Sequence, residues 1–468
     1  MSMKLDEHQN EDQDRSKIHF GHKTRFVILI LGMLCLTTIN GNAMTMNFTV
    51  ICMQDVVIDQ KGNSSEPHWL ESTQDVSLLF SALAVGQLLG TIPSVHLFSN
   101  AGVRLTLTIY GAFSAIGTIL VPIAVSIGFP AVIFVRVMQG IGSSIIFTAL
   151  GAISDRWAPK SEMSTYVAVL SCGLQLSFIV VNPLAGLMCG STLGWRALYY
   201  VLGVFSITIF VIFFFFYSDC PSNHRNVSSL ELKKIGEGKA PKSTAGVPYK
   251  AMVKDRVIVG IWLSVIGGNL GFFMLMYYGP TYLNKVLKFD VTETGFANAL
   301  PYVLAVVVKM VAGPLSDYST CVSERIRMIV FATVSQAAMA IGLIVMALTT
   351  NRIVAQIAFT TAIVLVGCNV VGVVKCAQLV ARQYIHFVMA VISFTACIST
   401  FILPIIVGWM CPDNTPEQWC RFFLCIAALI ALTNVAFPIV ATTEPAEYTK
   451  PGWNEENKRK SGQAWLEG

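Results

Sequence analysis

The sequence has few charged residues for its length. Only 13% of its 468 residues are Asp, Glu, Lys or Arg, whereas 54% are hydrophobic. Soluble globular chains carry about 25% charged residues, so this chain lacks the polar surface that a multi-domain soluble protein needs. The shortage of charge indicates a polytopic membrane protein that lies in a lipid bilayer.

Residue patterns of common enzymes and metal sites are also missing. No Gly-rich loop ends in Lys-Ser or Lys-Thr, which excludes a P-loop ATPase, and neither His-Glu-x-x-His nor a paired-Cys metal spacing occurs. The net charge is +5, but the basic residues lie in short segments between apolar runs. We therefore expect no enzymatic activity, no cofactor or metal, and no nucleic-acid partner.

Twelve apolar runs reach the roughly 20 residues that span a bilayer as a helix. Six lie in the first half of the chain and six in the second, with a polar segment between them. The pattern predicts an all-α membrane protein with two six-helix halves, 26–217 and 254–441. A linker at 218–253, rich in Ser, Lys and Gly and expected to be flexible, joins the halves, and tails at 1–25 and 442–468 flank them.

Lys and Arg are concentrated in the two tails, in the linker and in the loops on the same side. Because positive residues favour the cytoplasmic side, both termini and the linker are predicted to be cytoplasmic. The loop 54–74 on the opposite side contains Asn63-Ser64-Ser65, a sequon in which Asn63 could be glycosylated. The sequence leaves open whether the membrane is the plasma membrane or that of an intracellular vesicle.

The stretch RVMQGIGSSIIFTALGAISDRWAPKSE, residues 136–162, places an arginine in an apolar helix and follows it with a Trp-Ala-Pro loop. Arg136, Gln139, Trp157 and Glu162 have the spacing of the fourth helix and following loop of solute-carrier family 17. The chain resembles a divergent invertebrate branch of that family, whose members are phosphate and organic-anion transporters of the major facilitator superfamily. The resemblance implies a major facilitator fold, with substrate bound near the membrane midplane between the halves.

The family's functional residues are not kept at several positions. Ser143 stands where well-studied members keep a glutamate associated with proton coupling. Thr45 and Gly268 fall near the positions of substrate-facing arginines on the first and seventh helices. The family's coupling acid and anion-binding arginines therefore cannot be carried over, and a coupling ion, H⁺ or Na⁺, is left open.

Cations are the ionisable groups found deep in the predicted spans. A charge at the bilayer centre costs about 2.5 kcal/mol or more, so it usually faces protein or water. Arg136 either lines the pathway or pairs structurally with a carbonyl or an acid. Lys309 either extends toward the cytoplasm or lines the pathway, and Lys375, on a small and polar helix face, is predicted to face a cavity.

Polar residues complete the predicted substrate pathway. Asn42 and Asn269 lie on the first and seventh helices, the paired helices that line the cavity in the superfamily. Gln139 and Ser143 lie on the fourth helix, and Tyr277 could either close over a substrate or pack as an ordinary aromatic. Many such polar groups only hold membrane helices together.

The chain has twelve cysteines, most of them in apolar runs, where they are expected to pack as small core residues. Cys411 and Cys420 instead flank a polar loop on the predicted non-cytoplasmic side. An oxidising compartment on that side would allow them to form a disulfide.

These features predict a monomeric secondary active transporter that moves a small organic or inorganic anion by alternating access. Two alternatives keep the same fold. One is a sensor or receptor that binds the anion without transporting it, and the other is a facilitator without ion coupling.

Overall fold

The computed structural model describes residues 23–61, 68–159, 162–237, 248–318, 322–450 and 453. The predicted glycosylation site, Asn63, lies outside them. The regular structure of the described residues is helical, with no strand, and twelve of its helices are long and apolar enough to cross a membrane. The predicted fold class is therefore confirmed.

The chain forms two compact units. Unit 1 comprises Met1–Met46 and Ala82–Pro241, and unit 2 comprises Asn47–Ser81 and Lys242–Gly468. The helices in chain order are α2 (Thr24–Thr49), α3 (Gln54–Lys61), α4 (Thr73–Ile127), α5 (Phe129–Ser143), α6 (Ile146–Trp157), α7 (Met163–Cys189), α8 (Gly194–Phe216), α9 (Ser229–Gly236), α10 (Tyr249–Lys254), α11 (Arg256–Thr281), α12 (Val291–Tyr318), α13 (Glu324–Leu348), α14 (Arg352–Val364), α15 (Lys375–Ala381), α16 (Ile385–Met410), α17 (Pro416–Asn434) and α18 (Ala436–Val440).

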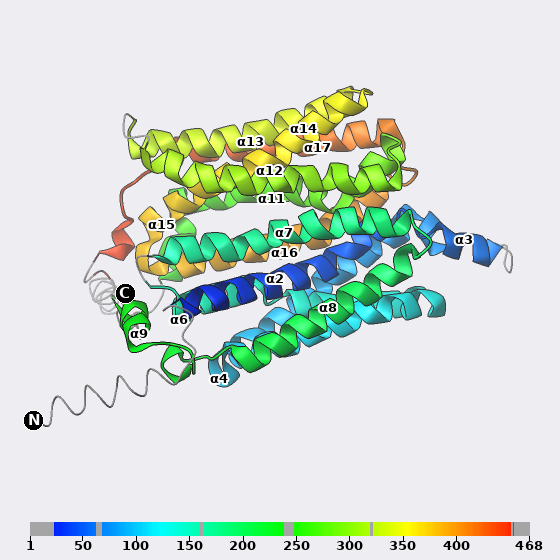
Figure 1. Cartoon of the computed structure of the whole chain (residues 1–468). Helices are drawn as coiled ribbons and strands as arrows, with labels where there is room; N and C mark the ends of the chain where they lie inside the picture. Colours follow the sequence, from blue (N-terminus) through cyan, green and yellow to red (C-terminus); the bar gives the residue numbers. More distant parts are fainter. Residues whose placement is uncertain are drawn as a thin grey trace, which may run out of the picture. The chain divides into compact units, whose positions relative to one another are not determined.

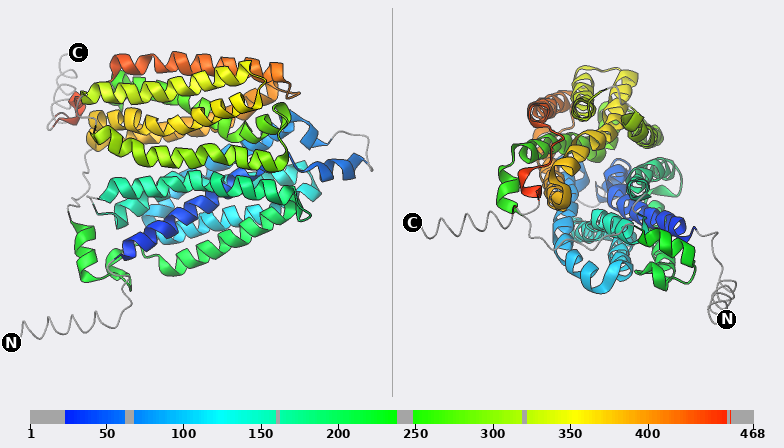
Figure 2. Two further views of the ribbon diagram at one scale, coloured as in Figure 1. Left: turned by 45° about the horizontal axis from the view of Figure 1, so that its top comes forward. Right: turned by 90° about the vertical axis from the view of Figure 1, so that its left-hand side faces the viewer.

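Each unit is a bundle of membrane helices packed side by side. In unit 1, α7 packs against α6 and α8, and in unit 2, α13 packs against α14 and α17 (Figures 1 and 2). Helix α11 contacts both α16 and α17. Short 3₁₀ and π-helical turns join α14 to α15, so that together they form one membrane span, Arg352–Ala381.

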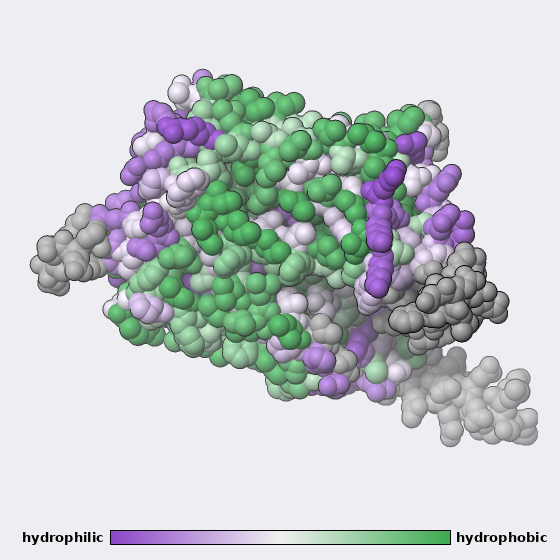
Figure 3. Space-filling view, turned by 180° about the vertical axis from the view of Figure 1, so that it is seen from behind, coloured by the Kyte–Doolittle hydropathy of each residue, from purple (hydrophilic) through white to green (hydrophobic). Residues whose placement is uncertain are grey.

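Large hydrophobic side chains are exposed along the membrane helices. Phe215 is 78% exposed and Trp409 is 79% exposed, which would be unfavourable in water. Hydrophobic residues cover much of the face in Figure 3, and hydrophilic residues gather toward its two ends. This distribution is the one expected of a surface in contact with lipid.

Helices α4 and α5 of unit 1 cross where two glycines meet. A Cβ atom on Gly86 would lie 2.2 Å from the Val137 carbonyl oxygen, and one on Gly140 would lie 2.1 Å from the Leu83 carbonyl oxygen. The helix backbones therefore touch, as small residues allow at membrane crossings. This contact fixes the position of the α5 segment that carries Arg136.

The chain turns at Gly102, near the start of the second of the two spans of α4, Thr73–Phe98 and Asn100–Ile127. Gly102 has a φ of 77°, which favours glycine. Beside it, the Val103 backbone N–H donates to Asp219 Oδ1 at 2.6 Å, and the Arg156 guanidinium donates to the same oxygen. A Cβ atom on Gly102 would lie 2.5 Å from Asp219 Oδ2, so the turn requires both the φ and the space that glycine provides.

The predicted linker contains two short helices, so the expectation of a flexible tether was wrong for its described parts. Helix α9 begins after Ser228, whose hydroxyl accepts the Glu231 backbone N–H at 3.2 Å. Ser at the N-cap with Glu three residues later is a recognised helix-start pattern, so the sequence did carry this signal. Helix α10 directly precedes α11.

Substituting Gly102 with alanine should destabilise the protein. The positive φ costs a non-glycine residue about 1–2 kcal/mol, and the new methyl group would press on the Asp219 carboxylate. We expect Gly102→Ala to lower the unfolding temperature of the purified protein in detergent.

A matched control is Gly151→Ala in α6, where no atom lies within 4 Å of the added Cβ. This variant should unfold at the wild-type temperature or slightly above it, because alanine favours helix. Equal unfolding temperatures for the two variants would contradict this explanation of the turn.

Candidate functional site

Three residues predicted to line the pathway form one buried hydrogen-bonded layer in unit 1. Arg136 Nη1 donates to the Ala43 carbonyl oxygen at 2.8 Å and to Gln139 Oε1 at 2.9 Å. Gln139 Nε2 donates to the Asn42 carbonyl oxygen at 3.2 Å and to Thr118 Oγ1 at 3.0 Å. Arg136 and Gln139 are fully buried and Asn42 is 1% exposed, so the layer is dry within its unit.

Asn42 bonds to a second residue of α4 and extends this layer to one further membrane span, α8. Its Nδ2 donates to the hydroxyls of Ser114 at 3.1 Å and Ser206 at 3.0 Å. The Ser206 hydroxyl donates back to Asn42 Oδ1 at 3.3 Å. The layer therefore connects α2, α4, α5 and α8 through bonds that compensate the cost of burying polar groups. For Arg136, the carbonyl contact is the structural pairing named as an alternative to a pathway role.

Ser143 lies one turn along α5 from this layer and is 5% exposed. Its hydroxyl donates to the Gly140 carbonyl oxygen at 3.0 Å and accepts from Gln87 Nε2 at 3.2 Å. A hydroxyl does not titrate at physiological pH. At the position expected to hold the family's glutamate, this chain therefore has two uncharged side chains, Ser143 and Gln87, hydrogen-bonded to each other.

The two positions that resemble arginine sites in the family hold no cation. The Thr45 hydroxyl bonds to the Gly41 carbonyl oxygen at 2.7 Å, and Thr45 is fully buried in unit 1. In unit 2, a Cβ atom on Gly268 would lie 2.5 Å from Gln336 Nε2, so Gln336 fills the space beside this glycine. Gln336 Nε2 in turn donates to the Ser264 carbonyl oxygen at 3.3 Å.

The predicted pathway residues of α11 differ in their surroundings. Asn269 Nδ2 is buried and has no hydrogen-bond partner among the described residues. Tyr277 is 1% exposed and its ring stacks on that of Phe80, with centroids 6.3 Å apart. The neighbouring Tyr278, for which the same two roles are open, has its hydroxyl 3.0 Å from the Ser77 hydroxyl. No periodic pattern signals that contact, because the two residues are far apart in sequence.

Lys375 has an acidic partner that the sequence analysis did not identify. Its Nζ lies 3.2 Å from Glu324 Oε1, in the first turn of α13. The ion pair therefore places the ammonium group level with a helix end rather than deep in the bundle. Lys309 on α12 is half-buried, and its Cβ lies 3.9 Å from the position that a Cβ on Gly367 would take.

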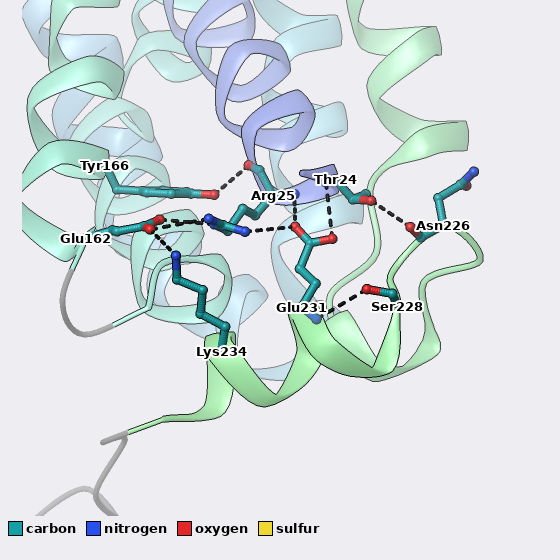
Figure 4. A network of polar contacts seen from close by, with 8 residues as sticks. All are labelled: Thr24, Arg25, Glu162, Tyr166, Asn226, Ser228, Glu231 and Lys234. Atoms are coloured by element: carbon teal, nitrogen blue, oxygen red, sulfur yellow. Dashed lines mark hydrogen bonds and ion pairs between the residues drawn. The ribbon is translucent and has the colours of Figure 1, made fainter. Parts of the chain in front are cut away.

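Sequence reasoning also missed an ion-pair network at the start of α2 (Figure 4). Arg25 Nε lies 3.0 Å from Glu162 Oε2, and Arg25 Nη1 lies 3.4 Å from Glu231 Oε1. Lys234 Nζ lies 2.7 Å from Glu162 Oε1. Glu231 also accepts the backbone N–H groups of Thr24 and Arg25. The network thereby ties linker helix α9 to the first turn of α2 and the start of α7.

Cys411 and Cys420 are free cysteines, so the disulfide suggested by their positions is wrong. Cys411 is fully buried after the end of α16, whereas Cys420 follows the buried Trp419 on α17. In unit 2, Cys52 is a disulfide-bonded cysteine.

Removing the Gln139 amide should destabilise the buried layer. Gln139→Leu would remove the side chain that accepts a hydrogen bond from the buried Arg136 and donates one to the Asn42 carbonyl oxygen. We expect the free energy of unfolding to fall by about 2–3 kcal/mol. The unfolding temperature in detergent should fall clearly below that of Gln175→Leu, since Gln175 Oε1 has no hydrogen-bond partner among the described residues. Similar effects of the two substitutions would show that the layer contributes no special stability.

The Glu162 network should make stability depend on pH. Hydrogen bonds from Arg25, then from Lys234, hold the pKa of Glu162 below its ordinary value of 4.5. Its contribution is therefore present above about pH 4.5 and is lost as pH falls through the lowered pKa. Glu162→Gln should cost about 1 kcal/mol at pH 7, and the gap in unfolding temperature from wild type should close as the pH falls below 4.5. A gap that stays constant with pH would contradict this assignment.

Comparison with known proteins supports the family expected from the motifs. The chain matches the family model of the Major Facilitator Superfamily over residues 29–404. Sialin from Ovis aries is 27% identical over 380 residues, covering 79% of this chain and 75% of that protein. Vesicular glutamate transporter 1 from Xenopus laevis is 24% identical over 468 residues, covering 94% of this chain and 78% of that protein.

Solved transporter structures share the fold. The partially occluded inward-open xylose transporter XylE from E. coli has a TM-score of 0.65 at 14% identity, covering 88% of this chain and 96% of its own. A bacterial homologue of the lysosomal transporter Spinster has a TM-score of 0.63 at 15% identity, covering 90% of this chain and 96% of its own. The family and these relatives are transporters rather than enzymes. The chain belongs to the Major Facilitator Superfamily.

Proposed function

We propose that this protein is a secondary transporter of a small organic or inorganic anion that works by alternating access. One observation carries the proposal: the fully buried charge of the hydrogen-bonded layer, Arg136, is a cation, and Lys309 and Lys375 add two more basic groups within membrane spans. The α2 and α5 sequences, which hold the buried layer, contain no Asp or Glu. A buried arginine in such surroundings favours a negatively charged solute nearby.

The relatives point to the same class of substrate. Vesicular glutamate transporters are named for glutamate, which is an anion at neutral pH. The chemistry of recognition must differ here, because Thr45 and the Gly268–Gln336 pair offer only neutral groups. We therefore propose an anion for this chain without carrying over the substrate of either relative.

A second proposal concerns coupling. Ser143, hydrogen-bonded to Gln87, cannot exchange a proton in the physiological range. This favours a facilitator in which anion movement is not coupled to H⁺ through α5. In that case, collapsing the proton and sodium gradients of a liposome should leave the flux unchanged. Flux that stops on collapse of one gradient would instead identify H⁺ or Na⁺ as the coupling ion.

We also propose that both termini and the linker are cytoplasmic, in a plasma-membrane or vesicle-membrane protein. The distribution of Lys and Arg supports this orientation. In unit 2, the disulfide-bonded Cys52 lies next to the loop predicted to be non-cytoplasmic, and disulfides persist in oxidising compartments.

Uptake into proteoliposomes tests the transport proposal and the roles of the two lysines. A panel of radiolabelled organic and inorganic anions should include at least one that enters wild-type liposomes and not empty ones. Lys309→Ala should reduce that uptake about tenfold or more, the effect of losing one charge-assisted contact. Binding of the panel without flux would favour a non-transporting sensor.

Glu324→Gln is the matched control for Lys375→Ala, because it breaks the same ion pair but keeps the cation. Equal effects of the two substitutions on uptake would assign the pair a structural role. A larger loss in Lys375→Ala would place the ammonium group in contact with the anion. Full uptake in both lysine variants would exclude Lys309 and Lys375 from the pathway.

A further inference from the structure

Unit 2 contains a cavity of about 620 Å³ that the proposed pathway does not use. It lies at the end of the unit where α11 finishes, on the side of α3 in Figure 1. Its walls come from the segment that joins α2 to α3, from the first turn of α4, from the end of α11 and from the loop before α17. All of its lining residues belong to unit 2.

One wall of the cavity is cationic. Lys285 and Lys288 line it and are both exposed. Lys285 lies in the π-helical turn Tyr282–Val286, and Lys288 follows with a φ of 57°. Among the described residues, no carboxylate lies within ion-pair distance of either ammonium group. A lysine in this backbone conformation is strained by about 1–3 kcal/mol, and such strain clusters at ligand sites.

The backbone around the lysines is held in place despite this strain. The Leu287 N–H donates to the Tyr282 carbonyl oxygen at 3.1 Å, and the Phe289 N–H donates to the Leu283 carbonyl oxygen at 3.0 Å. The two ammonium groups are therefore presented from a fixed turn rather than from a free loop.

Much of the remaining lining of the cavity is apolar. Ile51, Met53, Val57 and Val76 line it, together with the half-buried Leu70. Such a surface would contact the hydrocarbon or aromatic body of a ligand, at about 25 cal/mol for each Å² that it covers.

Two acids, Glu71 and Asp413, also line the cavity, but neither is paired with its lysines. Asp413 Oδ2 accepts a hydrogen bond from Gln418 Nε2 at 2.9 Å, so this carboxylate is already held within its own loop. Glu71 lies on the short turn before α4 and has a contact of its own. The lysines remain the charged groups of the wall without an ionic partner in the described chain.

We propose that this cavity binds an amphiphilic organic anion, with its negative group between Lys285 and Lys288 and its apolar body against Val57 and Val76. Pockets that combine apolar walls with a few convergent polar groups are typical ligand sites. The proposal does not depend on anion transport, because binding here requires only the geometry of unit 2.

Calorimetric titration of the full-length protein in lipid nanodiscs with 2-naphthalenesulfonate tests this site. The wild type should bind the sulfonate more tightly than the neutral analogue 2-naphthalenemethanol. Added salt should lower the affinity for the sulfonate, because it screens the charges. The double variant Lys285→Gln/Lys288→Gln should bind the sulfonate at least about tenfold more weakly, as expected for lost charge-assisted contacts. Its affinity for the neutral analogue should stay at the wild-type level.

Arg421→Gln is the matched control, since Arg421 is an exposed cation of unit 2 that does not line the cavity. It should bind the sulfonate as the wild type does. Equal sulfonate affinity in the wild type and the double lysine variant would overturn the proposal, and so would an absence of binding to the wild type. Loss of anion flux with sulfonate binding intact would count against the transport proposal alone.

Discussion

The fold of unit 1 depends on accommodating one buried guanidinium. Arg136 is fully buried in a membrane helix, so its N–H groups must find acceptors inside the protein. The Ala43 carbonyl and the Gln139 amide oxygen both accept from its Nη1, and Gln139 in turn bonds to α2 and α4. A shift of α2, α4 or α5 would take these acceptors away from the buried charge. The need to keep them therefore favours the observed arrangement of the three helices.

Close backbone contact makes that arrangement possible. Gly86 and Gly140 let α4 and α5 touch, which brings the Arg136 side of α5 within reach of its partners. Packing and hydrogen bonding are therefore mutually dependent in this unit.

Much of the fold could be predicted from composition and run length, because a bilayer allows few solutions to the burial of backbone polar groups. The motif from Arg136 to Glu162 supplied the family. Contacts between distant segments could not be predicted, since no spacing rule links Lys375 to Glu324 or Tyr278 to Ser77. The linker helix α9 could have been predicted, because Ser228 and Glu231 form a helix-start pattern. The Lys- and Gly-rich composition of the linker instead favoured the prediction of a flexible segment.

Of the candidate site, residue identities were predictable but their partners were not. Arg136, Gln139 and Asn42 stood out as polar residues in apolar helices, yet only the structure shows that they form a single layer. Gly268 was recognised as the place of a missing arginine, and the structure adds that Gln336 fills the space beside it. The chain thus keeps the scaffold of its family while changing the groups expected to recognise the solute.

The central claim is that the protein moves anions across a membrane. Its most direct test is the current recorded when a solute is added to proteoliposomes adsorbed on a solid-supported membrane. The account predicts currents with the sign of entering negative charge for at least one small anion, and none for organic cations of similar size. Currents carried by the cations, with none for any anion, would contradict it.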